Sequence, residues 1–237
     1  MSDGIYVSMN GAAARMAQLD SVSDNLANVE TPGFKAERPS FEAFLAKADA
    51  RDSASKVYAA AVATRVDLSP GAVVVTNDPM DVLPTGRSFL GVLTDKGVAL
   101  TRNGHLTVDS SGTLTAAGHP VVDKEGRAIV TPPSSTVRVE ASGAVYANDL
   151  KVADVGLWEP QGPVDRIGPS LLAPQDPSTI IPSSDQLHIG QIEHGNATAL
   201  EAAVQLVAAQ RHFEMSMQAL QTYKKLDDRA IEVGRVR

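Results

Sequence analysis

The chain has 237 residues, a net charge of −7 and no cysteine, so disulfides, thiolate metal sites and cysteine nucleophiles are excluded. Its basic residues are scattered along the sequence, which argues against nucleic acid as a partner because phosphate binding requires a concentrated basic surface. Only 4% of the residues are aromatic, so we expect a modest core or several thin ones.

The N-terminal segment predicts a helix with one narrow apolar face. Its apolar or small residues recur at alternating intervals of four and three, a spacing typical of a helix that pairs with another helix. The segment opens with an acidic residue and contains no long apolar run, so we predict neither a cleaved secretory signal nor a membrane span. We call these positions the N-terminal seam: Ile5, Met9, Ala12, Met16, Leu19, Ser23 and Leu26.

The stretch "DNLANVETPGFK" at 24–35 predicts where this helix ends. Pro32 disfavours a helical conformation at Thr31, and Pro-Gly suits the centre of a type II turn. The helix should therefore end by about Glu30, and Phe34 is expected to anchor the chain as it leaves the helix.

The middle of the chain predicts a small antiparallel β domain between two connectors. From Gly71 to Trp158, short β-prone runs alternate with turn pairs that supply Gly or Asn for positive φ. An Ala-rich piece within 34–70 is either helical or extended, and the Pro-rich stretch 162–191 is expected to be mostly irregular. The predicted hairpin-type turns are Asp95-Lys96-Gly97, Asn103-Gly104, Ser111-Gly112 and Glu125-Gly126.

The C-terminal segment, 198–235, predicts a second long helix, with no proline and no glycine before Gly234. Asn196 is the favoured N-cap, in preference to a glycosylated asparagine, and a capping box between Thr198 and Glu201 is the alternative. After Leu220 the apolar spacing changes phase and continues from Tyr223, as in a stutter of a coiled coil. The C-terminal seam consists of Ala199, Ala203, Leu206, Gln210, Phe213, Met217 and Leu220.

These elements together predict an α+β fold in which the N- and C-terminal helices pair as a coiled coil, with a small antiparallel β domain inserted between them. The expected boundaries are 1–30 with 195–237 for the helical domain, 31–80 with 160–194 for the connectors, and 81–159 for the β domain. The plainer alternative is that both seams pack on the core of their own domain.

No catalytic, phosphate-binding or metal-binding motif occurs in the sequence, so we expect neither enzymatic activity nor a cofactor. The stretch "TNDPMD" lacks the ligand spacing of a calcium loop and predicts a proline-containing turn before a strand. A secreted β-domain protein that binds or hydrolyses glycans would need a concave site with convergent polar groups. The sequence offers no obvious one.

Several stretches resemble the bacterial flagellar rod and hook proteins. "SDNLANVETPGFKAERPSFEAFL" (23–45) is similar to their N-terminal signature, and "GNATALEAAVQLVAAQRHFEMSMQAL" (195–220) to their C-terminal one. "DVLPTGRSFLGV" (81–92) and "LTRNGHLTVDSSGTLTAAGHPVV" (100–122) resemble the family's β domain. One departure occurs at Arg87-Ser88, where the family usually has a Gly followed by Phe. Length and the single β insert are most similar to a proximal rod protein, and a distal rod protein is the nearest alternative.

The resemblance implies a structural subunit whose terminal helices pair and pack against those of neighbouring subunits in a hollow rod that transmits torque. It implies that the partners are other rod and basal-body subunits, copies of the chain and the flagellar type III export apparatus, and that the location is the periplasmic rod, reached without a cleaved signal. The amides of Asn25 and Asn28 are expected to hydrogen-bond in the crowded helical assembly. The predicted assembly interface comprises Ile5, Met9, Met16, Leu19, Asn25, Leu26, Asn28, Pro32, Gly33, Phe34, Leu206, Gln210, Arg211, Phe213, Glu214, Met217 and Leu220.

Overall fold

The computed structural model describes residues 2–45 and 57–235 of the chain, with side chains left undescribed in parts of both long helices and of the first hairpin. The chain divides into two compact units. Unit 1 contains residues 1–26, 37–64 and 199–237, and unit 2 contains residues 27–36 and 65–198. The short segment 27–36 therefore interrupts unit 1 and belongs to the other unit.

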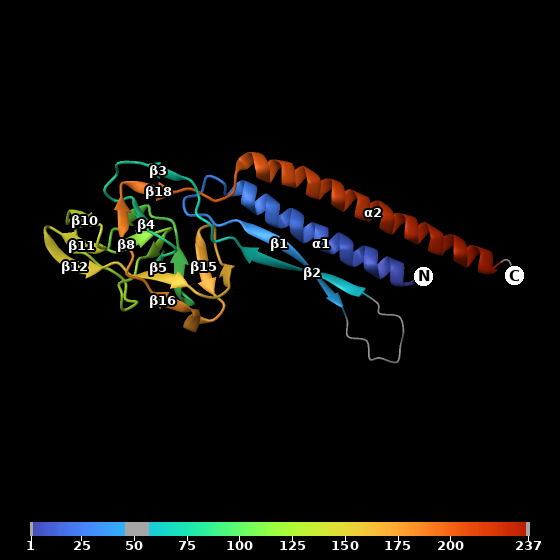
Figure 1. The fold of residues 1–237 in the computed structure, drawn as a ribbon, viewed down its shortest axis with the longest axis horizontal. Coiled ribbons are helices and arrows are strands. Elements are labelled where there is room, and N and C mark those ends of the chain that lie inside the picture. The colour runs from blue at the N-terminus through green and yellow to red at the C-terminus, as the bar shows by residue number, and fades with distance from the viewer. Residues whose placement is uncertain (1, 46–56, 236–237) are drawn as a thin grey trace. The chain divides into compact units, whose positions relative to one another are not determined.

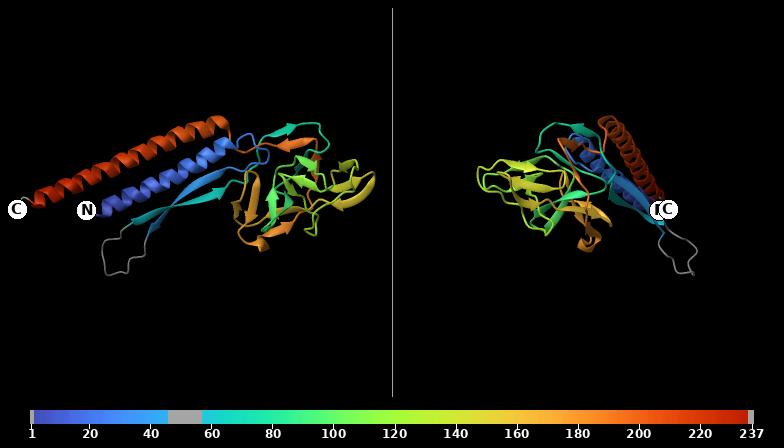
Figure 2. Two further views of the ribbon diagram at one scale, coloured as in Figure 1. Left: turned by 180° about the vertical axis from the view of Figure 1, so that it is seen from behind. Right: turned by 60° about the vertical axis from the view of Figure 1, so that its left-hand side comes forward.

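Unit 1 consists of two long helices and a β-ribbon. Helix α1 (Ser2–Ala27) and helix α2 (Ala199–Arg235) run alongside each other in opposite directions (Figure 1, Figure 2). Strands β1 (Glu37–Leu45) and β2 (Val57–Val66) form a two-stranded sheet, so the described parts of the Ala-rich piece are extended, while its residues 46–56 lie outside the described residues. Neither helix has a stretch that is both long and apolar enough to cross a membrane within its described residues.

Unit 2 is built from short strands that pair antiparallel, as the turn-punctuated sequence predicts. Its largest sheet has six strands in the order β14-β15-β6-β5-β13-β16. Smaller sheets join β10-β11-β12, β7-β8-β9, β17-β4 and β18-β3. The elements are β3 (Val73–Val75), β4 (Val82–Pro84), β5 (Phe89–Thr94), β6 (Gly97–Thr101), β7 (Leu106–Val108), β8 (Leu114–Ala116), β9 (His119–Pro120), β10 (Val137–Val139), β11 (Ala144–Ala147), β12 (Leu150–Asp154), β13 (Leu157–Pro160), β14 (Val164–Arg166), β15 (Leu171–Pro174), the 3₁₀ turn η1 (Pro177–Thr179), β16 (Ile180–Pro182), β17 (Leu187–Ile189) and β18 (Gln191–Glu193).

The core of unit 2 consists mainly of valine and leucine, in two clusters. The larger cluster is almost entirely aliphatic and includes Leu90, Leu106 and Leu114. The smaller one contains Phe89 and Trp158. The two clusters match the thin cores expected from the low aromatic content, because aliphatic side chains on short strands bury less area each than aromatic ones.

Two local predictions are wrong. The stretch 162–191 is not mostly irregular, because it forms strands β14 to β17 and the turn η1. Asn103-Gly104 is not a hairpin turn with positive φ, whereas Gly97 and Gly112 do have positive φ, at the β5–β6 and β7–β8 turns. A Cβ on Gly104 would lie 1.5 Å from the carbonyl oxygen of Val82. Glycine is needed at 104 for a close backbone approach, which a Gly-turn pattern in the sequence does not distinguish from a hairpin.

Candidate functional site

Helix α1 ends in a tight turn that leads the chain into unit 2. The backbone N–H of Thr31 donates to the carbonyl of Asn28 at 3.0 Å, and that of Phe34 donates to the carbonyl of Thr31 at 3.2 Å. Gly33 has a φ of +69°. The bond from Phe34 to Thr31 closes a four-residue turn. A positive φ at the third residue of such a turn, directly after a proline, is the geometry of a type II turn. The predicted helix end and Pro-Gly turn are both confirmed.

Gly33 also occupies a place where no side chain fits. A Cβ at this position would lie 2.1 Å from the backbone nitrogen of Asn103 and 2.3 Å from the carbonyl carbon of Arg102. The next residue, Phe34, is completely buried, and the guanidinium of Arg166 lies over its ring at 5.0 Å. Phe34 therefore anchors the chain in unit 2, as expected from the sequence.

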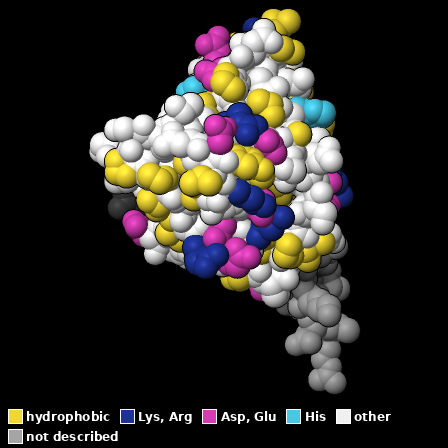
Figure 3. Space-filling model, turned by 90° about the vertical axis from the view of Figure 1, so that its left-hand side faces the viewer, with side chains coloured by type: hydrophobic (Ala, Val, Ile, Leu, Met, Phe, Trp, Pro, Cys, Tyr) yellow, Lys and Arg dark blue, Asp and Glu magenta, His cyan; other side chains and the backbone are white. Residues whose placement is uncertain are grey.

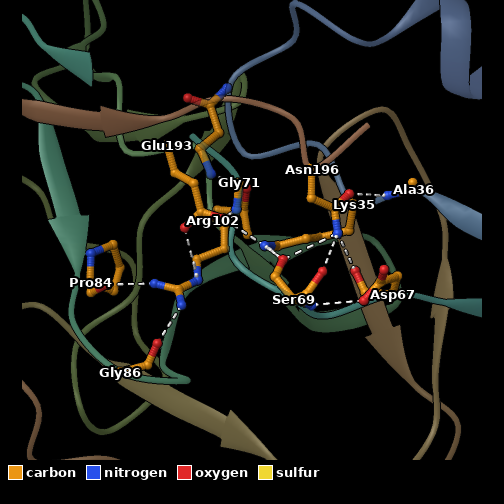
Figure 4. A network of polar contacts seen from close by, with 12 residues as sticks. Lys35, Ala36, Asp67, Ser69, Gly71, Pro84, Gly86, Arg102, Glu193 and Asn196 are labelled. Atoms are coloured by element: carbon orange, nitrogen blue, oxygen red, sulfur yellow. Dashed lines mark hydrogen bonds and ion pairs between the residues drawn. The ribbon is translucent and has the colours of Figure 1, made fainter. Parts of the chain in front are cut away.

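Lys35 and Glu193 form a buried ion pair between the segment after α1 and strand β18 (Figure 4). The Lys35 ammonium donates to Glu193 Oε1 at 2.6 Å and to the Ser69 carbonyl at 2.7 Å, and the two side chains are only 1% and 2% exposed. Glu193 Oε1 also accepts the backbone N–H of Gly71 at 2.8 Å. Burial lowers the pKa of Lys35, although Glu193 opposes that shift.

Arg102 brings a second buried cation to the same carboxylate. Its Nε lies 3.6 Å from Glu193 Oε2 and makes no hydrogen bond, while its two terminal nitrogens donate to the carbonyls of Pro84 and Gly86. Burial lowers the pKa of Arg102, and the carboxylates of Glu193 and Asp185 oppose that shift. One buried carboxylate thus balances two buried cations, so losing it would be costly.

Asn196 lies in unit 2 and hydrogen-bonds to residues that precede and follow the β1–β2 ribbon in the sequence. Its Oδ1 accepts the backbone N–H of Ala36 at 2.7 Å, and its Nδ2 donates to the carbonyls of Asp67 at 2.7 Å and Ser69 at 3.1 Å. The preferred prediction that Asn196 caps α2 is wrong, because α2 begins three residues later at Ala199. Thr198 instead precedes the helix and Glu201 is its third residue, the spacing of the alternative capping box.

Asn25 connects the last turns of α1 to the start of β1 within unit 1. Its Nδ2 donates to the carbonyl of Glu37 at 2.8 Å, and its Oδ1 accepts the backbone N–H of Glu37 at 3.0 Å. The buried amide thus pairs with a backbone unit as a neighbouring strand would. Asn28 is engaged locally, since its Oδ1 accepts the Thr31 hydroxyl at 3.3 Å. Both amides therefore hydrogen-bond within the subunit, and their predicted part in an assembly interface stays a prediction.

The buried face of α1 lies mostly opposite the N-terminal seam. Ala14, Ser21, Val22 and Asn25 are buried, and Ala12 is the buried residue of the seam. Met9 and Met16 are exposed and Leu19 and Leu26 are partly buried, while the side chain of Ile5 lies outside the described residues. Within one chain, most of the seam is therefore left without a full cover.

Helix α2 has apolar side chains on two opposite faces. The covered face includes the buried Ala202 and Ala209 and the partly buried residues Leu206, Phe213 and Leu220 from the predicted seam. Three other predicted interface residues, Gln210, Arg211 and Glu214, are exposed, as is Met217. We call the opposite face the α2 stripe: Leu200, Val204, Val207 and Met215, of which Leu200 is 79% and Val204 62% exposed.

The departure at Arg87-Ser88 leaves the local turn intact. The backbone N–H of Ser88 donates to the Thr85 carbonyl, and its buried hydroxyl donates to the Asp185 carboxylate and also hydrogen-bonds with the Ser183 hydroxyl. Arg87 is largely exposed. A buried serine is accommodated here because both hydrogen-bond partners are supplied by the segment before β17.

The surface of unit 2 carries a shallow polar hollow beside β12, in which several of the lining charges form ion pairs. Arg127 contacts Asp123 and Glu125, and Lys151 contacts Asp154 at 2.9 Å. Figure 3 shows acidic and basic side chains interspersed on the face that it displays. In the part of the chain that the structure describes, no group of three or more His, Cys, Asp or Glu side chains could hold a metal ion.

Sequence reasoning missed the buried charges, although it found the motif that contains one of them. Lys35 ends the motif, but its partner Glu193 is 158 residues further along the chain, and none of the three charged residues has an unusual local pattern. Only a pairing of β18 with β3 brings Glu193 beside the segment after α1.

Comparisons with known proteins agree at both ends of the chain. Residues 5–35 match a family model described as flagella basal body rod protein, and residues 190–233 match one described as flagellar basal body rod FlgEFG protein C-terminal. Lys35 and Glu193 lie within these two matches, and Arg102 lies between them.

Relatives match over nearly the whole chain. The flagellar basal-body rod proteins FlgF of Mesorhizobium japonicum and Salmonella typhimurium are 28% and 29% identical to it, with 98% and 97% of each chain covered. The rod protein FlgG of Bacillus subtilis is 24% identical, with 99% of this chain and 100% of FlgG covered. Over nearly its whole length the chain is therefore similar to flagellar basal-body rod proteins, and it resembles FlgF more than FlgG.

Proposed function

We propose that the chain is a structural subunit of the proximal part of the flagellar basal-body rod. Its relatives FlgF are basal-body rod proteins, and the resemblance to them extends along both chains. The role is mechanical: the subunit assembles with copies of itself and with other basal-body subunits into a hollow rod that transmits torque. A distal position is the second candidate, supported by the full-length match to FlgG.

The observation that carries this proposal is the uncovered apolar surface of unit 1. The α2 stripe lies opposite the face that the subunit itself covers, and Met9 and Met16 are exposed on α1. A long helix with apolar side chains on two faces needs more than one neighbour to bury them. Each residue of this kind contributes about 1.5–3 kcal/mol when fully buried, which becomes available only when neighbouring subunits arrive.

In the assembled rod, α1 and α2 pair along their seams as a coiled coil and pack against the same helices of neighbouring subunits. Leu206, Phe213 and Leu220 are only partly buried in the single chain, so further burial is open to them. The subunit reaches the periplasmic part of the rod through the flagellar type III export apparatus.

The proposal is tested by removing the gene from its bacterium and restoring it. Deletion should leave incomplete basal bodies, without rod and hook, and the parent gene should restore swimming. The double variant Val204→Asp with Val207→Asp should not restore it, because two carboxylates cannot be buried between apolar neighbours. Both residues are already exposed, so the purified variant should keep the unfolding midpoint of the parent chain.

A matched control places the same two changes elsewhere on α2. Gln205→Asp and Gln221→Asp alter exposed polar positions that lie off the face of the α2 stripe, and they should leave swimming intact. Normal rods in the deletion strain would refute the proposed function, and normal swimming with the Val204 and Val207 changes would refute the role of the α2 stripe.

A further inference from the structure

Two segments that adjoin the terminal helices in the sequence contact each other inside unit 2. Residues 31–36 follow α1 and residues 193–196 precede α2. The Gly33 N–H donates to the Glu193 carbonyl at 2.7 Å, and the Asn196 N–H donates to the Phe34 carbonyl at 3.3 Å. The Lys35–Glu193 ion pair and the bond from the Ala36 N–H to Asn196 Oδ1 complete this set of contacts. We call the two segments and these four contacts the clasp.

The two segments of the clasp bond to each other, and both also bond to a third segment, 67–72, which closes with them. The bond between Phe34 and Thr31 closes a local turn, but Gly33, Lys35 and Ala36 each bond to the other segment. Backbone groups that are buried without a partner are costly, so undocking one segment leaves the other with unpaired buried groups. A Cβ on Gly195 would lie 3.4 Å from the Cβ of Phe34, so the two segments also pack closely against each other at this glycine.

We propose that the clasp opens and closes as one cooperative unit, so that the segment after α1 is ordered only when the segment before α2 is docked, and the reverse. Coupling of this kind is reciprocal by thermodynamic necessity. The coupling links positions that are far apart in the sequence, since Lys35 and Glu193 are separated by 158 residues. The two segments that lead into the helices are thus held together or released together. This inference depends on unit 2 alone and not on the proposed assembly.

The charges make the two sides of the clasp unequal. Without the Glu193 carboxylate, Lys35 and Arg102 would remain as two buried cations, because Glu193 is the anion that faces both of them. Without the Lys35 ammonium, Glu193 would keep Arg102 and the Gly71 N–H. Removing one partner of a buried pair is costly when it leaves a charge uncompensated, so the change at 193 should open the clasp further.

Hydrogen exchange followed by mass spectrometry on the full chain tests the coupling. Glu193→Gln should speed exchange in both 28–36 and 190–198 by roughly 100-fold or more, with exchange in 137–147 unchanged. Lys35→Met should speed exchange in the same two segments together, by a smaller factor. Glu140→Gln breaks an exposed ion pair with Arg138 and should leave both segments at the parent rates.

Three outcomes would overturn the proposal. In the first, exchange speeds up only in the segment that carries the substitution. In the second, 137–147 accelerates as much as the two segments, which means that the network stabilises all of unit 2 and not a separate clasp. In the third, neither variant changes exchange in either segment. Should Glu193→Gln not fold, Asn196→Ala removes the side-chain contacts to Ala36, Asp67 and Ser69 without changing any charge and must still speed exchange in both segments.

Discussion

Gly33 is the residue at which backbone conformation and space both exclude a side chain. Gly33→Ala should lower the free energy of unfolding of unit 2 by about 2–5 kcal/mol, the sum of left-handed strain and overpacking. The matched control is Gly118→Ala, where φ is +76° but nothing lies within 4 Å of the added Cβ, so that only strain remains, about 1–2 kcal/mol. Urea unfolding of both variants measures the difference in the free energy of unfolding. Equal losses would mean that the backbone of Arg102 and Asn103 moves aside to accommodate the added methyl group.

Lys35 makes the stability of the chain depend on alkaline pH. Burial lowers its folded pKa below the ordinary value of 10.5, so the unfolded chain binds more protons between the folded pKa and 10.5. Stability must then rise with pH across this window. Urea unfolding at pH 7, 9 and 10.5 should show the parent chain gaining stability relative to Lys35→Met. A parent chain that instead loses stability relative to this variant would show that the ion pair raises the folded pKa of Lys35.

At the scale of elements, Asn25 supplies the connection between α1 and β1. Asn25→Leu removes both hydrogen bonds to the Glu37 backbone and should destabilise unit 1 by about 1–3 kcal/mol, because buried backbone groups lose their partners. Asn25→Asp keeps the acceptor for the Glu37 N–H and should lose less. Thermal unfolding of the isolated chain provides the measurement.

The double change Asn25→Leu with Asn28→Leu separates the intrachain role from the predicted interface role. We expect it to impair rod assembly and also to destabilise the isolated chain, since both amides hydrogen-bond within the subunit. If rods assemble normally with both leucines, the asparagines have no interface role. If assembly fails while the isolated chain keeps its full stability, the intrachain bonds contribute little.

The faces of the helices show which part of the element-level prediction depended on local pattern. The spacing of apolar residues predicted two long helices, and both are present. It did not predict which face one chain buries, because residues such as Ala14 and Ser21 are covered although they belong to no apolar seam. A narrow heptad pattern shows where the apolar side chains lie. It does not show which face is buried, because small residues such as alanine and serine allow close packing on any face that a neighbouring element covers.

For the whole molecule, the two units should differ in protection from hydrogen exchange. In a dilute solution of single chains, residues 5–27 and 199–225 should exchange quickly, because long helices with uncovered apolar faces open easily. The core strands β5, β6 and β8 should exchange slowly, since Leu90, Leu100 and Leu114 are fully buried. Strong protection of both helices in the dilute chain would contradict an assembly in which neighbours complete their packing.

Local spacing and contiguous motifs were enough to predict the two helices, the turn at Pro32-Gly33, the antiparallel strands and the likeness to flagellar rod proteins. They could not predict that residues 27–36 belong to unit 2 or that Lys35, Arg102 and Glu193 share one buried site, which required the folded structure. The reason is physical: a buried ion pair is favourable only where the fold removes water and aligns partners distant in sequence, and no local pattern records that alignment.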